Sequence, residues 1–160
     1  MISLLKPAIL FKEEIESKFA EIMYTRDAFF YNGYSHACQS LQVDSDDGVY
    51  HYAVVDKEDN VIGFFSYSYN WYTDSIERFG LISFDKNNVI VVADVLHEMK
   101  RLVKTYRRIE WQCVGSNPVN KVYERFCKKY NGNIIVRHKC VREINGEFVD
   151  SITYEIVNER

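Results

Sequence analysis

The amino-acid sequence predicts an α+β domain with three layers, in which helices cover both faces of a mixed, mostly antiparallel central sheet. Between residues 50 and 85, apolar side chains alternate with polar ones and two turn segments break the run, which is typical of an antiparallel meander. From Val89 the apolar residues step by three and four, which indicates a helix that faces a core. A strand, a second such helix and a hairpin on Asn145-Gly146 complete the pattern.

The first half of the chain is expected to hold two helices and three strands. Phe11, Ile15 and Phe19 share one face of a helix predicted at 10–24, and a second helical pattern follows at 27–42. Turn residues then separate the strands of the meander, which are predicted at 50–56, 61–70 and 76–85.

The second half returns the chain to the sheet. The elements predicted there are a helix at 89–105, a strand at 108–114, a helix at 119–130 and strands at 133–143 and 147–157. Because a crossover helix joins strands 76–85 and 108–114, we expect these two strands to be parallel. Parallel strands that separate at their carboxyl ends form a ligand site outside the sheet, so a ligand is expected there.

Length, charge and cysteine spacing limit the class of protein. A chain of 160 residues fits one domain, 1–160. The net charge of −3 gives no general attraction to nucleic acid or to an anionic membrane, and neither is an expected partner. No signal peptide and no membrane-spanning apolar run of ~20 residues are recognised. The four cysteines form no CxxC pair and have no metal-ligand spacing, which predicts reduced thiols, a cytoplasmic protein and no metal site.

The segment that carries most chemistry joins strand 108–114 to the following helix. It places the polar run Ser116-Asn117-Pro118 just before a helix that carries Tyr123. A side-chain amide, free backbone N–H groups and a phenol around one point can hold an acyl thioester and protonate its leaving sulfur. With reference pKa values of ~10 for a phenol and ~8.5 for a thiol, that proton transfer is uphill by only about 2 kcal/mol.

Other groups at the expected site complete the reaction. Backbone N–H groups of Ile82, Ser83 and Phe84, where strand 76–85 separates from its neighbour, are expected to polarise the thioester carbonyl. Glu77 has the strand parity to point into the site, and Glu110 lies on the opposing strand. Either carboxylate can act as general base, or water relays the proton and both are ordinary solvated carboxylates.

Residues 50–157 resemble the GCN5-related N-acetyltransferase superfamily. The resemblance is carried by the element order, by the segment 116–126 and by the closing hairpin. It implies an acyl-CoA N-acyltransferase-like fold, with Asn117 near the pantetheine arm of acetyl coenzyme A (acetyl-CoA) and Tyr123 facing the thioester sulfur. In a second alignment Asn120 is the equivalent amide, and Cys127 then takes the place of the phenol.

The pyrophosphate motif of that superfamily is degenerate in this chain. The family has Gln or Arg, two residues, Gly, one residue, and Gly or Ala, where the glycines let the backbone wrap a pyrophosphate at a helix N-terminus. In the corresponding run here, 88–93, Asn88 takes the lead position, Val91 the position of the key glycine and Val92 the unrestricted position, and only Ala93 fits. A helix start still offers N–H groups, so the resemblance implies coenzyme binding by these residues without the usual glycine loop.

The sequence therefore supports two hypotheses. The first is an acetyl-CoA-dependent N-acetyltransferase that acts on the amine of a small molecule or peptide. The alternative is a catalytically degenerate domain of the same fold that binds a partner protein or an acyl-CoA. The aromatic residues at the end of the second meander strand are expected to form a substrate wall or a homodimer contact; they are Tyr67, Tyr69, Trp71 and Tyr72.

Overall fold

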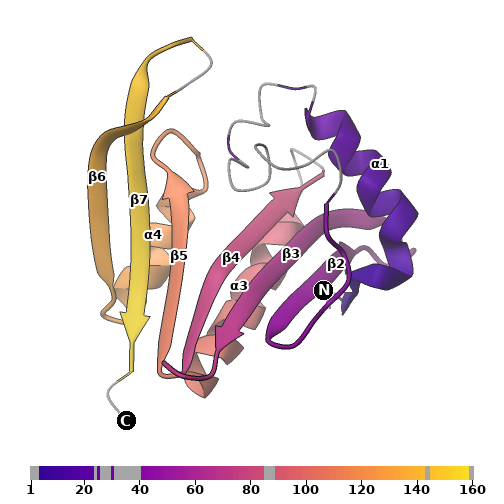
Figure 1. Ribbon diagram of the computed structural model, residues 1–160, viewed down its shortest axis with the longest axis horizontal. Coiled ribbons are helices and arrows are strands. Elements are labelled where there is room, and N and C mark those ends of the chain that lie inside the picture. The colour runs from indigo at the N-terminus through magenta and orange to yellow at the C-terminus, as the bar shows by residue number, and fades with distance from the viewer. Residues whose placement is uncertain are drawn as a thin grey trace.

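A computed structural model shows one mixed sheet of seven strands in the order β1-β2-β3-β4-β5-β7-β6 (Figure 1). The structure describes residues 4–23, 25, 30, 41–84, 89–142 and 145–158. A 3₁₀ turn (Ala8–Phe11) joins the first strand to the first helix. The strands are β1 (Leu4–Pro7), β2 (Val49–Val55), β3 (Val61–Asn70), β4 (Ser75–Ser83), β5 (Arg108–Val114), β6 (Asn133–Arg142) and β7 (Phe148–Val157), and the helices are α1 (Lys12–Met23), α3 (Val89–Thr105) and α4 (Asn120–Lys129).

The pairing of the strands confirms the predicted topology. β4 and β5 are parallel, and the other five neighbouring pairs of described strands are antiparallel. α3 is the crossover between β4 and β5, as parallel neighbours require. The carboxyl ends of β4 and β5 therefore lie at the same end of the sheet.

Helices cover both faces of the sheet (Figure 1), as the sequence predicts. α1 packs on one face, and α3 and α4 pack on the other. The residues that alternate along β3 contribute to two separate cores, since Phe64 belongs to the α1 side and Phe65 to the side of α3 and α4. The second core is the larger, and its bulkiest buried side chains are Trp111, Tyr154, Phe65, Met99, Leu102 and Ile109.

The face that α3 turns to the core differs from the predicted one by about one residue. The sequence prediction placed Val92 and Ala93 toward the core, but Val92 is half-buried and Ala93 is exposed. A helix start made of five consecutive apolar residues (89–93) has no polar position to fix its rotation. Among the described side chains of α3, the buried hydrophobic ones are Val91, Val95, Met99, Leu102 and Val103, and Asp94 is buried as well.

The remaining predicted elements are observed with small shifts of their ends. The exceptions lie in the N-terminal part of the chain. β1 was not predicted, because a strand of four residues is too short to show a period. Most of the predicted helix 27–42 lies outside the described residues, and its described end, Leu41 and Gln42, is not helical.

α4 ends where the Asn131-Gly132 pair predicts. Asn131 takes the left-handed conformation with φ 53°, and the Gly132 N–H donates to Cys127 O at 2.9 Å. The need for glycine at 132 comes from packing: a Cβ there would lie 2.5 Å from Glu155 O and 2.6 Å from Cys127 Sγ. The close approach holds α4 against β7, which positions the helix that carries Tyr123.

Candidate active site where β4 and β5 separate

β4 and β5 separate after an aromatic pair, which is the last of their three registered pairs. The last registered partners are Phe79 and Trp111, although β4 continues to Ser83 and β5 to Val114. Up to this pair the two strands are held by the parallel hydrogen-bond ladder, and beyond it each has a free edge toward the other. This is the separation at the carboxyl ends that the sequence predicts.

A bulge in β4 directly precedes the separation. Three residue steps from Ile76 to Phe79 face only two steps on β5, so β4 holds one extra residue. Arg78 takes up this residue with φ 51°, a left-handed conformation that is uncommon outside glycine. Such bulges bend a strand and occur often beside active sites, so the bulge gives a physical cause for the separation.

The backbone of β4 presents only part of the predicted donor set. The Phe84 N–H donates to Ile62 O of β3 at 3.0 Å, so that N–H is not available for a ligand. Because N–H and C=O groups alternate in direction along a strand, Ile82 also turns its backbone to β3, while Leu81 and Ser83 turn theirs toward β5. The side chain of Ile82 is buried on the α1 side. Leu81, which the prediction did not include, is thus better placed as a backbone donor than Ile82 or Phe84.

Tyr123 lies at the point of separation. Its ring packs edge-on against Trp111, with 5.9 Å between ring centroids, and against Tyr154 at 5.8 Å. Tyr123 is buried from solvent, as is Trp111, whose indole N–H has no hydrogen-bond partner within the described part of the chain. The structure thus brings the predicted phenol next to the β5 residue at which the ladder ends.

The two candidate amides have different surroundings. Asn117 Oδ1 accepts from the Val119 N–H at 3.1 Å, and its Nδ2 has no acceptor among the described residues. Asn120 Nδ2 donates to three backbone carbonyls, those of Val114 at 2.7 Å and of Gly115 and Asn117 at 3.0 Å. Asn120 Oδ1 accepts from the Tyr154 hydroxyl at 2.8 Å. Asn120 is therefore fully used inside the protein, while Asn117 retains a donor for a ligand.

The start of α3 is only partly described. Asn88 lies outside the described residues. Val91, which the sequence prediction aligned with a glycine of the superfamily, has a fully buried side chain, with Cγ1 only 2.9 Å from where a Cβ on Gly63 would lie. At the contact between α3 and β3 the glycine is therefore Gly63 of β3, and the helix contributes Val91. Val92 and Ala93, the other predicted coenzyme ligands, lie on the solvent side of Val91.

The carboxylates of the site are held by neighbours. Glu77 Oε1 accepts from Ser75 Oγ at 2.7 Å, so the half-buried carboxylate is fixed at the bulge. Glu110 pairs with Arg108, which also donates from Nε to Glu155 Oε1 at 2.7 Å. Hydrogen bonds from Arg108 and then from Asn133 hold the pKa of Glu155 below its usual range. Glu110 therefore belongs to an ion-pair network, whereas the described contacts of the Glu77 carboxylate are with neutral groups.

The depressed pKa of Glu155 predicts acid-sensitive stability. Such a group stabilises the fold above its unfolded pKa of ~4.3, and this stabilisation is lost as pH falls through the folded value. We expect Glu155→Gln to unfold at lower urea concentration than wild type at pH 7, and the difference to shrink between pH 4.5 and 3. The control is Glu147→Gln at the β6–β7 turn, the same substitution at an exposed carboxylate. A constant deficit of Glu155→Gln from pH 7 to 3 would contradict the assignment.

The two buried cysteines, Cys113 and Cys127, do not offer a nucleophile. Cys113, Cys127 and Cys140 are free thiols, and Cys38 lies outside the described residues. Burial raises the pKa of the Cys113 thiol to about 12. Burial also raises the pKa of Cys127, whose Sγ lies 3.3 Å from Asn133 O. Cys127 is thus a packed core residue, which favours the alignment that uses Tyr123. Within the described residues no group of three or more His, Cys, Asp and Glu could hold a metal ion.

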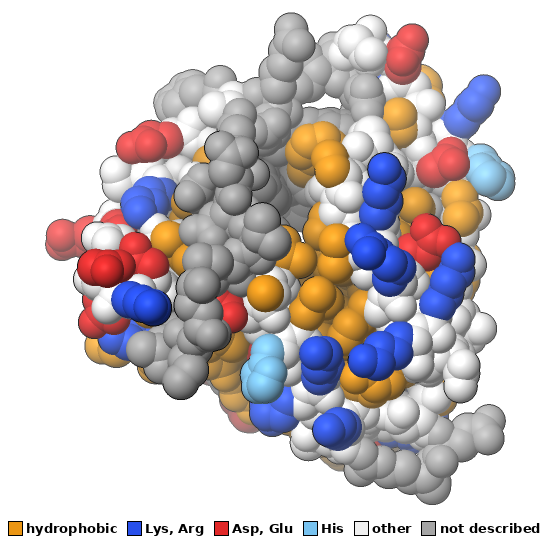
Figure 2. Space-filling view, turned by 180° about the vertical axis from the view of Figure 1, so that it is seen from behind, with side chains coloured by type: hydrophobic (Ala, Val, Ile, Leu, Met, Phe, Trp, Pro, Cys, Tyr) orange, Lys and Arg blue, Asp and Glu red, His pale blue; other side chains and the backbone are white. Residues whose placement is uncertain are grey.

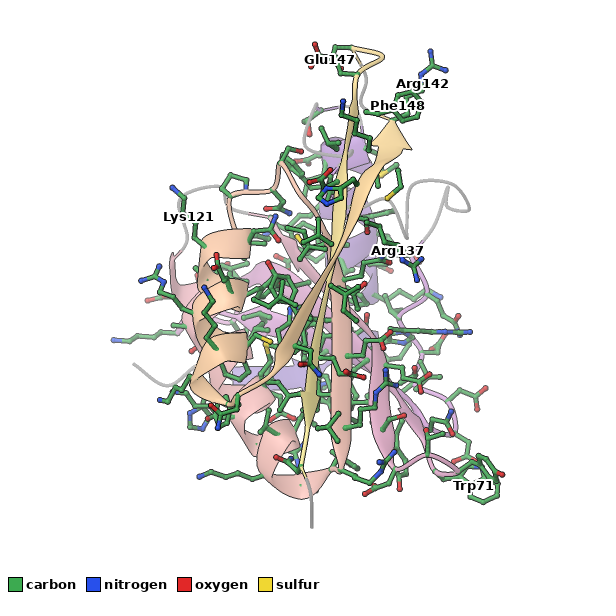
Figure 3. All side chains as sticks on the ribbon, turned by 90° about the vertical axis from the view of Figure 1, so that its left-hand side faces the viewer. Trp71, Lys121, Arg137, Arg142, Glu147 and Phe148 are labelled. Carbon is green, nitrogen blue, oxygen red and sulfur yellow. The ribbon has the colours of Figure 1, made fainter. Side chains whose placement is uncertain are left out.

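The helical face beside the site is cationic. Lys and Arg side chains gather there around a band of hydrophobic ones (Figure 2). Lys121 projects from the first turn of α4, on the side of the sheet opposite to Arg137 (Figure 3). α4 contributes four cations and one carboxylate, Glu124. The exposed cations of α3 and α4 are Lys100, Arg101, Lys104, Lys121, Arg125, Lys128 and Lys129.

The exposed aromatic pair lies away from the site. Trp71 and Tyr72 form the turn between β3 and β4 and are 79% and 82% exposed. Trp71 projects at the end of the molecule opposite to the β6–β7 turn with Glu147 (Figure 3), and so opposite to the carboxyl ends of β4 and β5. Tyr67 is buried, and Tyr69 packs on Tyr106 with centroids 4.9 Å apart. A substrate wall at 71–72 is therefore not supported by this position.

Similar solved structures extend over nearly the whole chain. Spermidine N-acetyltransferase from Vibrio cholerae, in complex with CoA and spermine, aligns with 97% of this chain and 95% of its own, with TM-score 0.65 and 16% identity. A GNAT-family protein from Chromobacterium violaceum ATCC 12472 aligns with 98% of this chain and 88% of its own, with TM-score 0.64 and 15% identity. For N-acetyltransferase from Staphylococcus aureus Mu50 the shares are 98% and 99%, the TM-score 0.61 and the identity 13%.

The amino-acid sequence matches no protein-family model and no curated protein. None of the helices that the structure describes has the length and apolarity to cross a membrane. The fold is thus identified by the sheet order, the separated parallel pair and the structural matches. On these findings the chain has the fold of the GCN5-related N-acetyltransferase (GNAT) superfamily.

Proposed function

We propose that this chain is a cytoplasmic, acetyl-CoA-dependent N-acetyltransferase that acts on the amine of a small molecule or peptide. The observation that carries the proposal is the contact between Tyr123 and Trp111 at the last β4–β5 pair. A phenol at this point can serve a thioester arm that lies along the two free strand edges. Leu81 and Gln112 turn backbone N–H and C=O groups to this gap, and such groups match the amides of a pantetheine arm.

In the proposed reaction the amine nitrogen attacks the thioester carbonyl carbon and the carbon–sulfur bond breaks. The thiolate that leaves takes the phenol proton of Tyr123, and the amine gives a proton to a base. Glu77 is the proposed base, directly or through water, because Ser75 fixes its carboxylate at the bulge that precedes the gap, and it forms no ion pair with the described residues. The backbone N–H of Leu81 or Ser83 would polarise the carbonyl oxygen.

The cationic helical face supports a polyanionic donor. The phosphates of coenzyme A would be attracted by the Lys and Arg residues of α4 (Figure 2) and by the N–H groups at the start of α3. With Val91 in place of the loop glycine, affinity would depend more on these cations than on a backbone nest. We propose that Asn117 adds the free Nδ2 donor to the pantetheine arm.

The proposal is tested by titrating the protein with acetyl-CoA. Binding at 100 times Kd should stabilise the fold by about 2.7 kcal/mol, measured as a rise in melting temperature. NAD⁺ is the control, since it shares the adenine and pyrophosphate but has no thioester arm. Transfer is then followed as thiol release with spermidine and with a short peptide as amine probes, because a structural neighbour is a spermidine N-acetyltransferase. No thermal shift at millimolar acetyl-CoA would contradict the proposal.

The alternative function is a catalytically degenerate domain that binds a partner protein or an acyl-CoA, or that forms a homodimer. The observation in its favour is the aromatic turn of Trp71 and Tyr72, which is exposed and remote from the site. The two functions are separated by the thiol-release assay. Measured acetyl transfer would count against the degenerate domain, whereas acyl-CoA binding without transfer to any amine would favour it.

A further inference from the structure

A continuous layer of aromatic rings closes the gap between β4 and β5 at its inner end. Phe65 contacts Phe79 with centroids 4.7 Å apart, Phe79 contacts Trp111 at 6.3 Å, and Trp111 contacts Tyr123 at 5.9 Å. We name these four residues the aromatic wall. Each of them is at least nine-tenths buried, so the layer leaves no open surface between its members.

The aromatic wall stands at the end of any path along the free strand edges. The edges of β4 and β5 begin at the carboxyl ends, near Ser83 and Val114, and end at the Phe79–Trp111 pair. A thioester arm that lies along these edges enters from the carboxyl ends, because the parallel ladder closes the other end. Its acyl group is the leading part, and it meets Phe79 and Trp111 beside Tyr123.

We infer that the aromatic wall restricts the donor to the shortest acyl group, so that the chain uses acetyl-CoA and excludes longer acyl-CoA. The inference rests on the proposed function and names the size of its acyl donor. Phe79 and Trp111 act as the stop because they form the last pair of the ladder and belong to a packed core. A longer acyl chain would have to displace rings that are buried against β3 and α4.

The expected preference for acetyl-CoA over longer acyl-CoA is large. It is opposite to the usual gain in affinity when methylene groups are added to an apolar ligand. Where an acyl chain finds apolar space, each added methylene tightens binding by about 4-fold. Where the space is already filled, the added atoms force buried side chains out of place, and binding weakens by about 10-fold or more. Butyryl-CoA is therefore expected to bind at least about 10-fold more weakly than acetyl-CoA.

The test compares dissociation constants of free CoA, acetyl-CoA, butyryl-CoA and hexanoyl-CoA by calorimetry, which needs no amine. Phe79→Leu makes room at the stop, and Phe79→Val is a second variant with more room. The matched control is Phe126→Leu, which removes the same atoms from α4 at a ring that contacts Trp111 at 6.1 Å but lies outside the wall. Thermal unfolding of each variant confirms that it is folded at the temperature of the titration.

We expect the Phe79 variants to bind butyryl-CoA within about 3-fold of acetyl-CoA, and Phe126→Leu to keep the wild-type discrimination. Wild-type protein that binds butyryl-CoA as tightly as acetyl-CoA would overturn the inference and leave the proposed function standing. The inference would also be overturned if Phe79→Leu and Phe126→Leu reduced the difference between butyryl-CoA and acetyl-CoA affinity equally. General loosening of the core would then be the cause. Failure of free CoA itself to bind would remove the proposed function and the inference together.

Discussion

Replacing Tyr123 by Phe is expected to slow acetyl transfer by about 10²-fold while acetyl-CoA binds almost as in wild type. The substitution removes one oxygen and keeps the ring that packs on Trp111 and Tyr154. A positioned general acid contributes about 10²–10⁴-fold to a rate, and water can replace part of that contribution, so the lower end is expected. The measurement is kcat from thiol release, together with the dissociation constant of acetyl-CoA from calorimetry.

Tyr154→Phe is the matched control for that prediction. The two tyrosines contact each other and both contact Trp111, but the Tyr154 hydroxyl donates to Asn120 Oδ1 at 2.8 Å, and burial raises the pKa of Tyr154. Its loss is expected to lower stability by about 1 kcal/mol and to leave kcat within about 3-fold of wild type. If both variants lose turnover equally, Tyr123 has no role that its neighbour lacks, and the proposed proton transfer is wrong.

The sequence was sufficient to predict the elements that carry the site. The change of period at Val89 locates α3 with its observed ends, and the alternation around Trp111 locates β5 with its observed ends. Because a helical crossover forces parallel neighbours, the parallel pairing of β4 and β5 followed from element order alone. These features depend on spacing within one segment, which a single sequence displays.

What the sequence could not show depends on contacts between segments. The bulge at Arg78 has no glycine to mark it, since an arginine takes the positive φ there. The occupied N–H of Phe84 and the availability of Leu81 depend on the β3–β4 register. The role of Phe79 as the last partner of Trp111 likewise emerges only when the two strands are paired, since these residues are far apart in the sequence. The directions in which the backbone groups of β4 turn therefore could not be predicted from the sequence.

Asn120→Ala is expected to destabilise the fold by about 3 kcal/mol, since it removes a donor from three backbone carbonyls and leaves the buried Tyr154 hydroxyl without its acceptor. For a domain of this size the melting temperature should fall by about 6–12 °C. Asn117→Ala is the matched change three residues earlier. It removes only the acceptor for the Val119 N–H, so a loss of about 1 kcal/mol is expected.

The same pair of variants decides between the two alignments that the sequence left open. If Asn117 binds the pantetheine arm, Asn117→Ala weakens acetyl-CoA binding with little change in melting temperature, while Asn120→Ala acts mainly on stability. If Asn120 is the coenzyme amide, Asn120→Ala instead weakens acetyl-CoA binding and Asn117→Ala acts mainly on stability. The backbone carbonyls that Asn120 contacts would then have to be hydrogen-bonded by water in the Asn120→Ala variant. The structure favours the first outcome because the side-chain amide of Asn120 is hydrogen-bonded inside the protein. Its Nδ2 donates to carbonyls at the end of β5 and before α4, and its Oδ1 accepts from Tyr154 of β7. Those contacts fix the turn from which Tyr123 reaches Trp111. A fall in the stability of Asn120→Ala with unchanged affinity for acetyl-CoA would therefore show that Asn120 supports the site and does not contact the donor.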